Sequence, residues 1–278
     1  MESGRVSQTA LKVAATMITL SRKRGWRERL PAGMAEMTER LILAARVPPY
    51  NRSTLRMGKR RWAVRMSEFG ERLQPGTFEG LGERKLFMNE QVLAAIEAGA
   101  TQVLIIGAGF DTLCLRLAPQ FPEVQFVEVD HPATSAAKRR GVEREGRPDN
   151  MLQIAADLAE ESLTDVLADS GTWDADRQSV AVAEGLLYYL GADTVLELFR
   201  EIDASSGPGS RVAFSHLLDL EAHGLARAAL SFYGEPWLSS SFTEDLDAYI
   251  GPPWHVVTTA AGEHRDLEGF AVAEKPPA

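Results

Sequence analysis

Residues 102–106 (QVLII) form an apolar run that stops at the turn Gly107-Ala108-Gly109. The length and composition of this run predict a buried strand. Glycines directly after a strand let the backbone adopt unusual conformations and approach a ligand closely. The helix expected at 111–118 offers unpaired N–H groups beside them. This order of strand, glycine turn and helix indicates a site for a ligand that carries a charge or a ribose.

From Glu83 onward, helical and strand patterns alternate along the chain. Such alternation predicts right-handed βαβ units and a parallel sheet with helices on both faces. Two short strands at the end, joined by a polar turn, predict an antiparallel hairpin on that sheet. We therefore predict an α/β fold with a doubly wound, mostly parallel, seven-stranded sheet. The expected strands are 102–106, 124–130, 152–157, 179–190 (which runs into a loop), 211–219, 255–260 and 269–274, and the expected helices are 83–98, 111–118, 132–145, 160–169 and 192–204.

The residues before this alternating region are expected to form an N-terminal helical cap. Helical patterns cover 5–46, with breaks at Gly25 and at Pro31-Ala32-Gly33, and a further helix is expected at 54–70. A glycine-bearing connector should follow at 73–82. The predicted domains are residues 1–82, a cap or lid, and residues 83–278, the ligand-binding domain.

The composition is that of a soluble globular protein, with 45% hydrophobic and 25% charged residues among 278. No run of about 18 apolar residues is present, which excludes a transmembrane helix. No small-residue cleavage site precedes Arg22, so a secretory signal is not expected. The single cysteine, Cys114, cannot form an internal disulfide. A reducing cytoplasm fits these features best, and no membrane partner is expected.

The net charge of −9 conceals an uneven distribution of charge. Residues 1–65 hold 15 Lys/Arg and 4 Asp/Glu, whereas residues 66–278 hold 15 and 35. The segment 52–65 (RSTLRMGKRRWAVR) has six basic residues and no acidic one. A nucleic-acid patch is one interpretation. Residues 66–278 are acidic and would repel phosphate. They favour the second interpretation, in which 52–65 belongs to a basic helical cap that lies on an acidic core.

Acidic residues stand where the expected strands end, and ligands of doubly wound sheets bind beyond these ends. The second strand ends at Asp130, about 20 residues past the glycine turn, where a ribose diol is commonly bound. The third ends at Asp157-Leu158, and the fourth at Glu184. Asp130 and Asp157 also suit helix caps. Glu184 follows an apolar run and would otherwise need a buried partner.

Two ligand classes fit such a site, nicotinamide dinucleotides and S-adenosylmethionine (SAM). Thr112 stands where a dinucleotide fingerprint has a third Gly or Ala. An acid after the third strand suits an adenine amino group, and a sulfonium favours an acidic pocket. The terminal hairpin is also typical of SAM-dependent methyltransferases. The residues therefore favour SAM, and no metal site is indicated.

The segments VLIIGAGFDT, FVEVDHPAT, AADL and AEGLLYYL, in this order, resemble the leucine carboxyl methyltransferase-like family of class I SAM-dependent methyltransferases. The resemblance extends over roughly residues 7–275 and is closest to bacterial small-molecule O-methyltransferases. It implies a Rossmann-like methyltransferase domain with SAM as cofactor and S-adenosylhomocysteine (SAH) as product.

The resemblance also implies roles for individual residues. Gly107 and Gly109 would line the methionine part of SAM, Asp130 would bind the ribose, and Asp157 with the Leu158 backbone would hold the adenine. Arg84 would pair with the cofactor carboxylate, and Glu184 would stand near its amino group and the acceptor. One departure is Leu113, which replaces an arginine that the family often has after Asp-Thr.

The acceptor pocket is less defined by the sequence. Tyr188, Tyr189 and His216 follow the fourth and fifth strands, so Glu184, Tyr188 and His216 are the candidate catalytic residues. Phe232, Tyr233 and Trp237 suggest an aromatic wall, and segment 52–65 a lid that attracts an acidic substrate.

The predicted function is transfer of a methyl group from SAM to a carboxyl or hydroxyl oxygen of a small molecule, possible acceptors being acidic or aromatic. Three alternatives stay open: a nicotinamide-dependent oxidoreductase, a nucleic-acid methyltransferase that uses 52–65, and a SAM-binding protein without catalysis.

Overall fold

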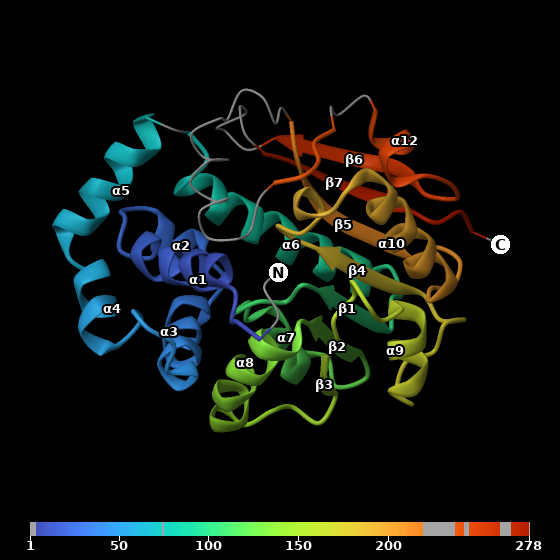
Figure 1. Cartoon of the computed structure of the whole chain (residues 1–278), viewed down its shortest axis with the longest axis horizontal. Helices are drawn as coiled ribbons and strands as arrows, with labels where there is room; N and C mark the ends of the chain where they lie inside the picture. Colours follow the sequence, from blue (N-terminus) through green and yellow to red (C-terminus); the bar gives the residue numbers. More distant parts are fainter. Residues whose placement is uncertain (1–3, 74, 219–236, 242–244, 262–267, 278) are drawn as a thin grey trace.

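The computed structural model describes residues 4–73, 75–218, 237–241, 245–261 and 268–277 (Figure 1). In these ranges a seven-stranded sheet has the order β3-β2-β1-β4-β5-β7-β6. Strands β1 to β5 are parallel, and β7 runs antiparallel between β5 and β6. The strands are β1 (Gln102–Ile106), β2 (Gln125–Asp130), β3 (Met151–Ala155), β4 (Ser179–Ala183), β5 (Arg211–Leu217), β6 (His255–Ala261) and β7 (Glu268–Glu274). The predicted doubly wound sheet with its antiparallel hairpin is confirmed.

Two hydrophobic cores follow from the alternation of side chains along the strands. Val103 and Ile105 of β1 face one core, with side chains from α1, α3, α6, α7 and α8. Leu104 and Ile106 face the other, with α9, α10 and α12. The helices of the sheet domain are α6 (Glu79–Glu97), α7 (Leu113–Leu117), α8 (Pro132–Glu145), α9 (Leu163–Asp169), α10 (Ala192–Ala204) and α12 (Leu246–Ile250), with short 3₁₀ helices η1 (Ala118–Gln120) and η2 (Leu187–Tyr189).

The N-terminal residues form a set of helices beside the sheet, with α5 at the outer edge of the molecule (Figure 1). Leu11 of α1 and Leu41 of α3 belong to the same core as the β1 side chains. Gly141 of α8 allows α3 to approach, because a Cβ there would lie 2.6 Å from Leu41 Cδ2. The cap helices are α1 (Gln8–Leu20), α2 (Trp26–Arg29), α3 (Met34–Ala45), α4 (Arg52–Gly58) and α5 (Arg61–Leu73). The domain boundary at 82/83 stays a prediction.

Several element boundaries differ from those expected. The helix expected at 54–70 is two helices, α4 and α5, and an Asn51 capping box begins the first of them. Helix α6 begins at Glu79, inside the expected connector. Helix α12 was not foreseen from the sequence. No helix in the described ranges combines the length and apolar character needed to cross a bilayer.

Candidate functional site

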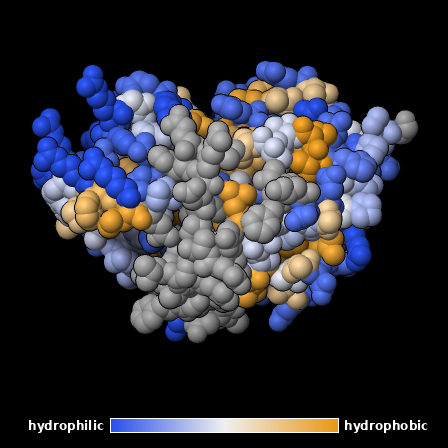
Figure 2. All heavy atoms as spheres, turned by 90° about the horizontal axis from the view of Figure 1, so that it is seen from above, coloured by the Kyte–Doolittle hydropathy of each residue, from blue (hydrophilic) through white to orange (hydrophobic). Residues whose placement is uncertain are grey.

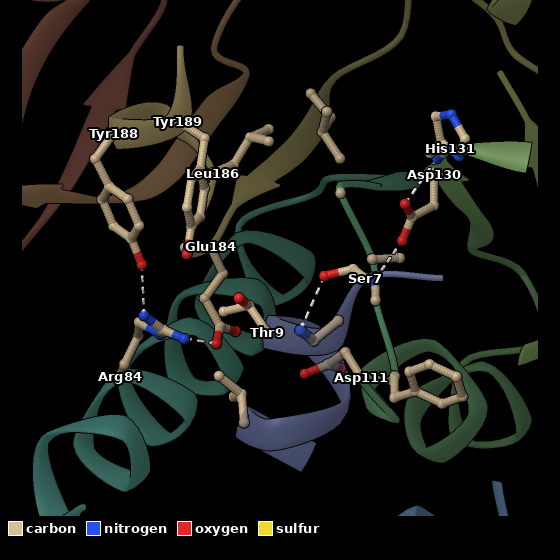
Figure 3. A pocket seen from close by; sticks show the side chains of 18 of the residues that line it. Ser7, Thr9, Arg84, Asp111, Asp130, His131, Glu184, Leu186, Tyr188 and Tyr189 are labelled. Atoms are coloured by element: carbon tan, nitrogen blue, oxygen red, sulfur yellow. Dashed lines mark hydrogen bonds and ion pairs between the residues drawn. The ribbon is translucent and has the colours of Figure 1, made fainter. Parts of the chain in front are cut away.

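A cavity of about 750 Å³ lies beyond the carboxyl ends of β1, β2 and β4. The glycine turn and the expected strand-end acids line it together, and helix α1 forms another wall. Figure 3 shows Asp130 and His131 at one end and Tyr188 and Tyr189 at the other, with Glu184 between them. We call these the polar end and the aromatic end. The lining residues named from the sequence are Arg84, Gly107, Gly109, Asp130, Asp157, Leu158, Glu184, Tyr188, Tyr189 and Trp237.

The glycine turn depends on left-handed backbone conformations and on close contact with α1. Gly107 has φ +68° and Gly109 has φ +47°, a region that other residues rarely adopt. A Cβ on Gly109 would lie 3.0 Å from the Cβ of Ala10. Ser7 caps α1 and donates its backbone N–H to Thr134 Oγ1 at 3.1 Å, which ties the start of α1 to α8. Helix α1 is therefore fixed across the turn.

Asp130 sits at the end of β2 and holds the glycine turn. Its Oδ2 accepts a hydrogen bond from Gly109 N at 2.5 Å, and its Oδ1 accepts one from His131 N at 2.7 Å. Burial raises the pKa of this carboxyl to about 6, although both backbone hydrogen bonds oppose the shift. Each carboxylate oxygen can accept a further hydrogen bond. Asp130 thus retains the capacity to accept two hydroxyl donors, as a ribose diol requires.

Asp157 lies next to Asp130 across the polar end and is partly open to solvent. Its Oδ1 accepts a hydrogen bond from Ala159 N at 3.2 Å, and its Oδ2 lies 3.5 Å from His131 Nε2. His131 was missed in the sequence, where it was only the residue after Asp130. Its backbone N–H and its ring connect the two predicted acids.

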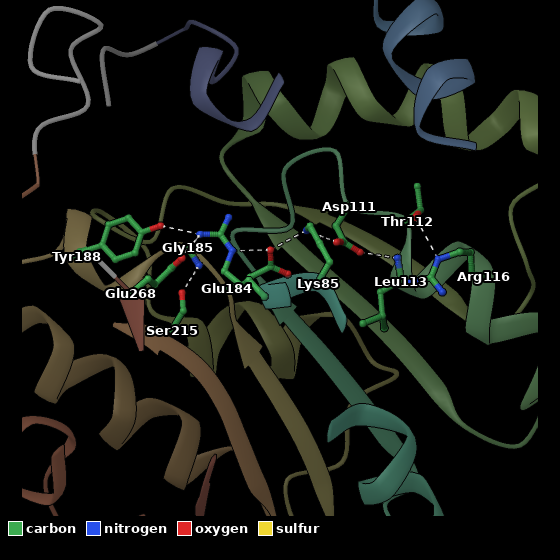
Figure 4. Close-up of polar contacts among 11 residues, drawn as sticks. Lys85, Asp111, Thr112, Leu113, Arg116, Glu184, Gly185, Tyr188, Ser215 and Glu268 are labelled. Carbon is green, nitrogen blue, oxygen red and sulfur yellow. Dashed lines mark hydrogen bonds and ion pairs between the residues drawn. The ribbon is translucent and has the colours of Figure 1, made fainter. Parts of the chain in front are cut away.

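Arg84 is buried and pairs with Tyr188 and Glu184 (Figure 3). It belongs to an ion-pair network whose members Glu268, Glu184 and Lys85 are labelled in Figure 4. Its Nε donates to Glu184 Oε1 at 3.0 Å, and its Nη1 donates to Glu268 Oε1 at 2.8 Å and to Tyr188 Oη at 3.0 Å. Burial would lower the pKa of this guanidinium, but the Glu268 and Glu184 carboxylates raise it well above its ordinary value. Arg84 therefore stays a cation inside the protein.

Lys85 extends the network to the glycine turn. Its Nζ lies 2.9 Å from Glu184 Oε1 and also contacts Asp111 Oδ2. Burial opposes the charge on both groups, yet Asp111 raises the pKa of Lys85 and the Lys85 ammonium lowers that of Asp111. Lys85, Asp111 and Glu268 were not among the predicted site residues. Two consecutive cations before the first strand were the only signal in the sequence for Lys85.

The aromatic end combines a buried phenol with an indole. The Tyr188 and Trp237 rings meet edge-on with centroids 5.7 Å apart. Burial, together with the nearby Glu268, raises the pKa of the Tyr188 hydroxyl well above its ordinary value, so it remains protonated. The Trp237 indole N–H is buried and has no hydrogen-bond partner in the described parts of the chain. Phe232 and Tyr233 of the expected aromatic wall lie outside the described residues.

His216 does not reach the cavity. Its ring lies over Gly269 of β7, where a Cβ would be 2.5 Å from Nε2, and its Nδ1 pairs with the Ser241 carbonyl at 2.9 Å. Burial lowers the pKa of this imidazole. Because side chains alternate along β5, His216 lies on the same face as Phe214, with ring centroids 6.2 Å apart, and Leu217, which lines the cavity, lies on the other face. The expectation that His216 contacts the acceptor is not supported by this position.

Segment 52–65 does not cover the cavity either. The residues before position 83 that line it come from α1 and its N-cap Ser7, from α3, from the loop at 76–77 and from Leu81 of α6, and none comes from α4 or α5. Helix α1 forms that wall of the cavity here, and a lid role for 52–65 stays a prediction. Leu113, the departure from the family pattern, is buried in the core, and Arg116 one turn later contacts Thr112 Oγ1 at 3.2 Å.

The charge of the cavity favours a cationic ligand over a pyrophosphate. Seven carboxylates and three basic side chains line it in the described parts of the chain. Asp111 Oδ1 also accepts the Leu113 N–H at the start of α7, at 2.5 Å. A pyrophosphate would meet this carboxylate where a dinucleotide site offers free N–H groups. Within the described ranges no group of three His, Cys, Asp or Glu is arranged to hold a metal ion.

The sheet and its strand-end site together define a class I SAM-dependent methyltransferase. The model of the leucine carboxyl methyltransferase family matches residues 18–203. The chain belongs to this family.

Similar proteins agree with this assignment. A relative from Mycobacterium bovis (strain BCG / Pasteur 1173P2), which carries the name of a SAM-dependent methyltransferase, is 28% identical over 303 residues, covering 99% of this chain and 83% of the relative. A solved structure from Thermobifida fusca YX, described as a methyltransferase, has TM-score 0.63 and 19% identity and covers 91% of this chain and 98% of its own. At that identity the solved structure supports the fold alone. The cofactor is SAM, and the oxidoreductase and nucleic-acid alternatives find no support.

Proposed function

We propose that this methyltransferase methylates an oxygen of a small molecule, and that the oxygen belongs to a carboxylate on an apolar body. The observation that carries the proposal is the aromatic end of the cavity, where two buried hydrogen-bond donors, the Tyr188 hydroxyl and the Trp237 N–H, stand among apolar side chains. The family description, leucine carboxyl methyltransferase, supports the same acceptor chemistry.

The cofactor would occupy the polar end. Asp130 would accept the ribose hydroxyls, Asp157 and the Leu158 backbone would hold the adenine, and Gly107 and Gly109 would allow close approach. Among the described residues, the ion-pair network uses Nε and Nη1 of Arg84 and Oε1 of Glu184. Arg84 Nη2 and Glu184 Oε2 would therefore face the cofactor's carboxylate and amino groups. SAM, when bound, supplies a methyl group on a positively charged sulfur.

Within the part of the chain that the structure describes, the aromatic end offers hydrogen-bond donors and no general base, and this combination suits a carboxylate acceptor. Tyr188 stays protonated, and so it can donate to an acceptor oxygen but cannot remove a proton at neutral pH. Oε1 of Glu184 is shared by Arg84 and Lys85. A carboxylate is already ionised and needs no base, whereas a hydroxyl would need one. Its negative charge also matches the sulfonium, and both charges disappear when the S–CH₃ bond breaks and the O–CH₃ bond forms.

Alignment of the acceptor is then the main contribution of the chain. When an oxygen is held in line with a methyl group, the entropy cost of bringing two separate molecules together is met on binding and not in the reaction step. Well-aligned reactants then react with effective concentrations of about 10⁵ M or more. Tyr188 and Trp237 would orient the carboxylate, and the apolar side chains around them would exclude water from it.

The chemical lability of the product tests the proposal. The enzyme is incubated with methyl-labelled SAM and a panel of apolar carboxylic acids and matched alcohols and phenols. A methyl ester releases labelled methanol in mild alkali, whereas a methyl ether does not. We expect volatile label from acids. Turnover confined to alcohols or phenols, with an alkali-stable product, would contradict the carboxylate assignment.

A further inference from the structure

The outer helix of the cap, α5, carries a stripe of large apolar side chains, each of which is more than half exposed in the described structure. Trp62, Met66, Phe69 and Leu73 of α5 are 55%, 61%, 54% and 72% exposed. Their spacing of four, three and four residues places them on one face of the helix. Large apolar side chains gathered on a surface mark an interaction site. We call them the α5 stripe.

The charges of α5 are sorted by face. Its acidic residues point into the protein, since Glu71 is buried and accepts the N–H groups of Gly76 and Phe78, and Glu68 lies 3.9 Å from Lys23 Nζ. Its three arginines, Arg61, Arg65 and Arg72, are exposed. Met57 and Arg56, both exposed, extend the same composition onto α4. Figure 2 shows apolar atoms beside strongly hydrophilic ones at the left end of the molecule, where α4 and α5 lie in Figure 1.

A second copy of the chain does not complement the stripe. If the stripe residues are taken as the seam of a coiled coil, the flanking positions are Arg65 and Arg72 on one side and Ala63 and Gly70 on the other. An antiparallel pair would set arginine against arginine, and a parallel pair would set arginine against glycine. Neither arrangement gives an attractive charge pair.

We propose that α4 and α5 form a docking surface for an anionic lipid membrane. Aromatic and aliphatic side chains on one face and arginines beside them are the composition of helices that lie in a bilayer interface. Helix α5 lies at the outer edge of the molecule (Figure 1), which suits contact with a broad surface. Residues 52–65 carry six basic side chains and no acidic one, whereas residues 66–278 carry an excess of 20 negative charges. The face that holds α4 and the first turns of α5 therefore has the charge that suits an anionic surface. This revises the expectation from the sequence that no membrane partner exists.

The position of the surface links it to the cavity. Glu71 binds the backbone of Gly76, and Gly76 and Thr77 line the cavity wall. A docked α5 therefore lies one short loop away from the site. This arrangement suits an apolar acceptor that partitions into lipid, although the docking itself does not depend on the identity of the acceptor.

Flotation with lipid vesicles tests the proposal on the full chain. Vesicles of phosphatidylcholine with added phosphatidylglycerol should carry the protein upward, and vesicles of phosphatidylcholine alone should carry much less. Raised salt should weaken the binding. The Trp62→Ser/Phe69→Ser variant should lose it, whereas Val257→Ser, which removes an exposed apolar side chain on β6, should not. Melting followed by circular dichroism verifies that each variant is folded.

A second pair of variants tests how much the arginines of α5 contribute to vesicle binding. Arg61→Gln/Arg65→Gln should reduce the partition coefficient about fivefold per arginine, the equivalent of about 1 kcal/mol each near an anionic surface. Arg139→Gln/Arg144→Gln, exposed arginines on α8, should leave it unchanged. Methyl transfer to a dissolved acceptor should be the same in all these variants.

Two results would overturn the proposal. One is equal flotation of the wild type and the stripe variant. The other is a concentration-dependent dimer, or complex with an acidic peptide, that the stripe variant abolishes while vesicles fail to bind.

Discussion

The two ends of the cavity are built on different principles. At the polar end, the glycine turn, Asp130 and Asp157 follow successive strands, and backbone geometry places each one. At the aromatic end, Tyr188, Trp237 and Glu268 come from separate parts of the chain and meet only through tertiary packing. The strand ends of the sheet therefore position the residues proposed to bind the cofactor, whereas the residues proposed to bind the acceptor depend on the segments that surround the sheet.

The largest expected effect lies at the polar end. Asp130→Ala and Asp157→Ala should each weaken SAM binding by about 1–3 kcal/mol, as expected when a hydrogen bond to a charged group is lost. Isothermal titration calorimetry measures the change, with Asp169→Ala, an exposed acid at the end of α9, as control. Unchanged SAM affinity in both site variants would contradict the assignment of the cofactor to the polar end.

The contact between α1 and the glycine turn gives the next effect. Gly109→Ala should cost about 1–2 kcal/mol for the left-handed backbone and more for the clash with Ala10. Gly171 also has a left-handed backbone, with φ +64°, and no neighbour within 4 Å of a Cβ, so Gly171→Ala should carry the backbone cost alone. Thermal unfolding of both variants, and of the Ala10→Gly/Gly109→Ala double variant, separates the cost of the left-handed backbone from the cost of the clash. No rescue by Ala10→Gly would mean that α1 does not cover the turn.

At the aromatic end, the expected loss is in turnover. Tyr188→Phe removes a donor to the acceptor and a partner of Arg84 and should lower kcat about tenfold, the equivalent of a net hydrogen bond of about 1.4 kcal/mol. The Kd of SAM should stay near its wild-type value. Tyr249→Phe, which removes a hydroxyl bonded to Ser239 outside the cavity, is the matched control. A changed SAM affinity with normal kcat would assign Tyr188 to the cofactor instead.

The smallest effect is on pH dependence. With a pKa of about 6, Asp130 loses about three quarters of its charge between pH 7 and pH 5.5, so SAM affinity should fall about fourfold. Because this pKa is raised above that of the unfolded chain, the Asp130 contribution to folding becomes more favourable as the pH falls through 6. SAM affinity and thermal stability of the wild type and of Asp130→Asn, measured between pH 7 and pH 5.5, check both directions. In the wild type, affinity should fall and the Asp130 contribution to stability should rise as the pH is lowered. A flat SAM affinity would contradict the raised pKa.

The same contrast explains what could be predicted from the sequence. Helices α8 and α10 begin and end where expected, because Pro132 marks a start and periodic apolar residues define a face. Asp130, Asp157 and Glu184 are expected at one edge of the sheet because each stands at or just after the end of a strand, and all three line the cavity. Glu268 gave no signal, because it reaches Arg84 from 184 residues away in the sequence. The sequence predicts that His216 contacts the acceptor because it stands near the end of the fifth strand. Its burial against Gly269 could not be predicted, because it depends on how β5 and β7 pair.

A crystal structure with bound SAH tests the central claim most directly. We predict the ribose on Asp130, the adenine beside Asp157 and Leu158, and the sulfur directed toward Tyr188 and Trp237. A sulfur atom that points away from the aromatic end, or a ribose held by other residues, would contradict the division of the cavity into a cofactor end and an acceptor end.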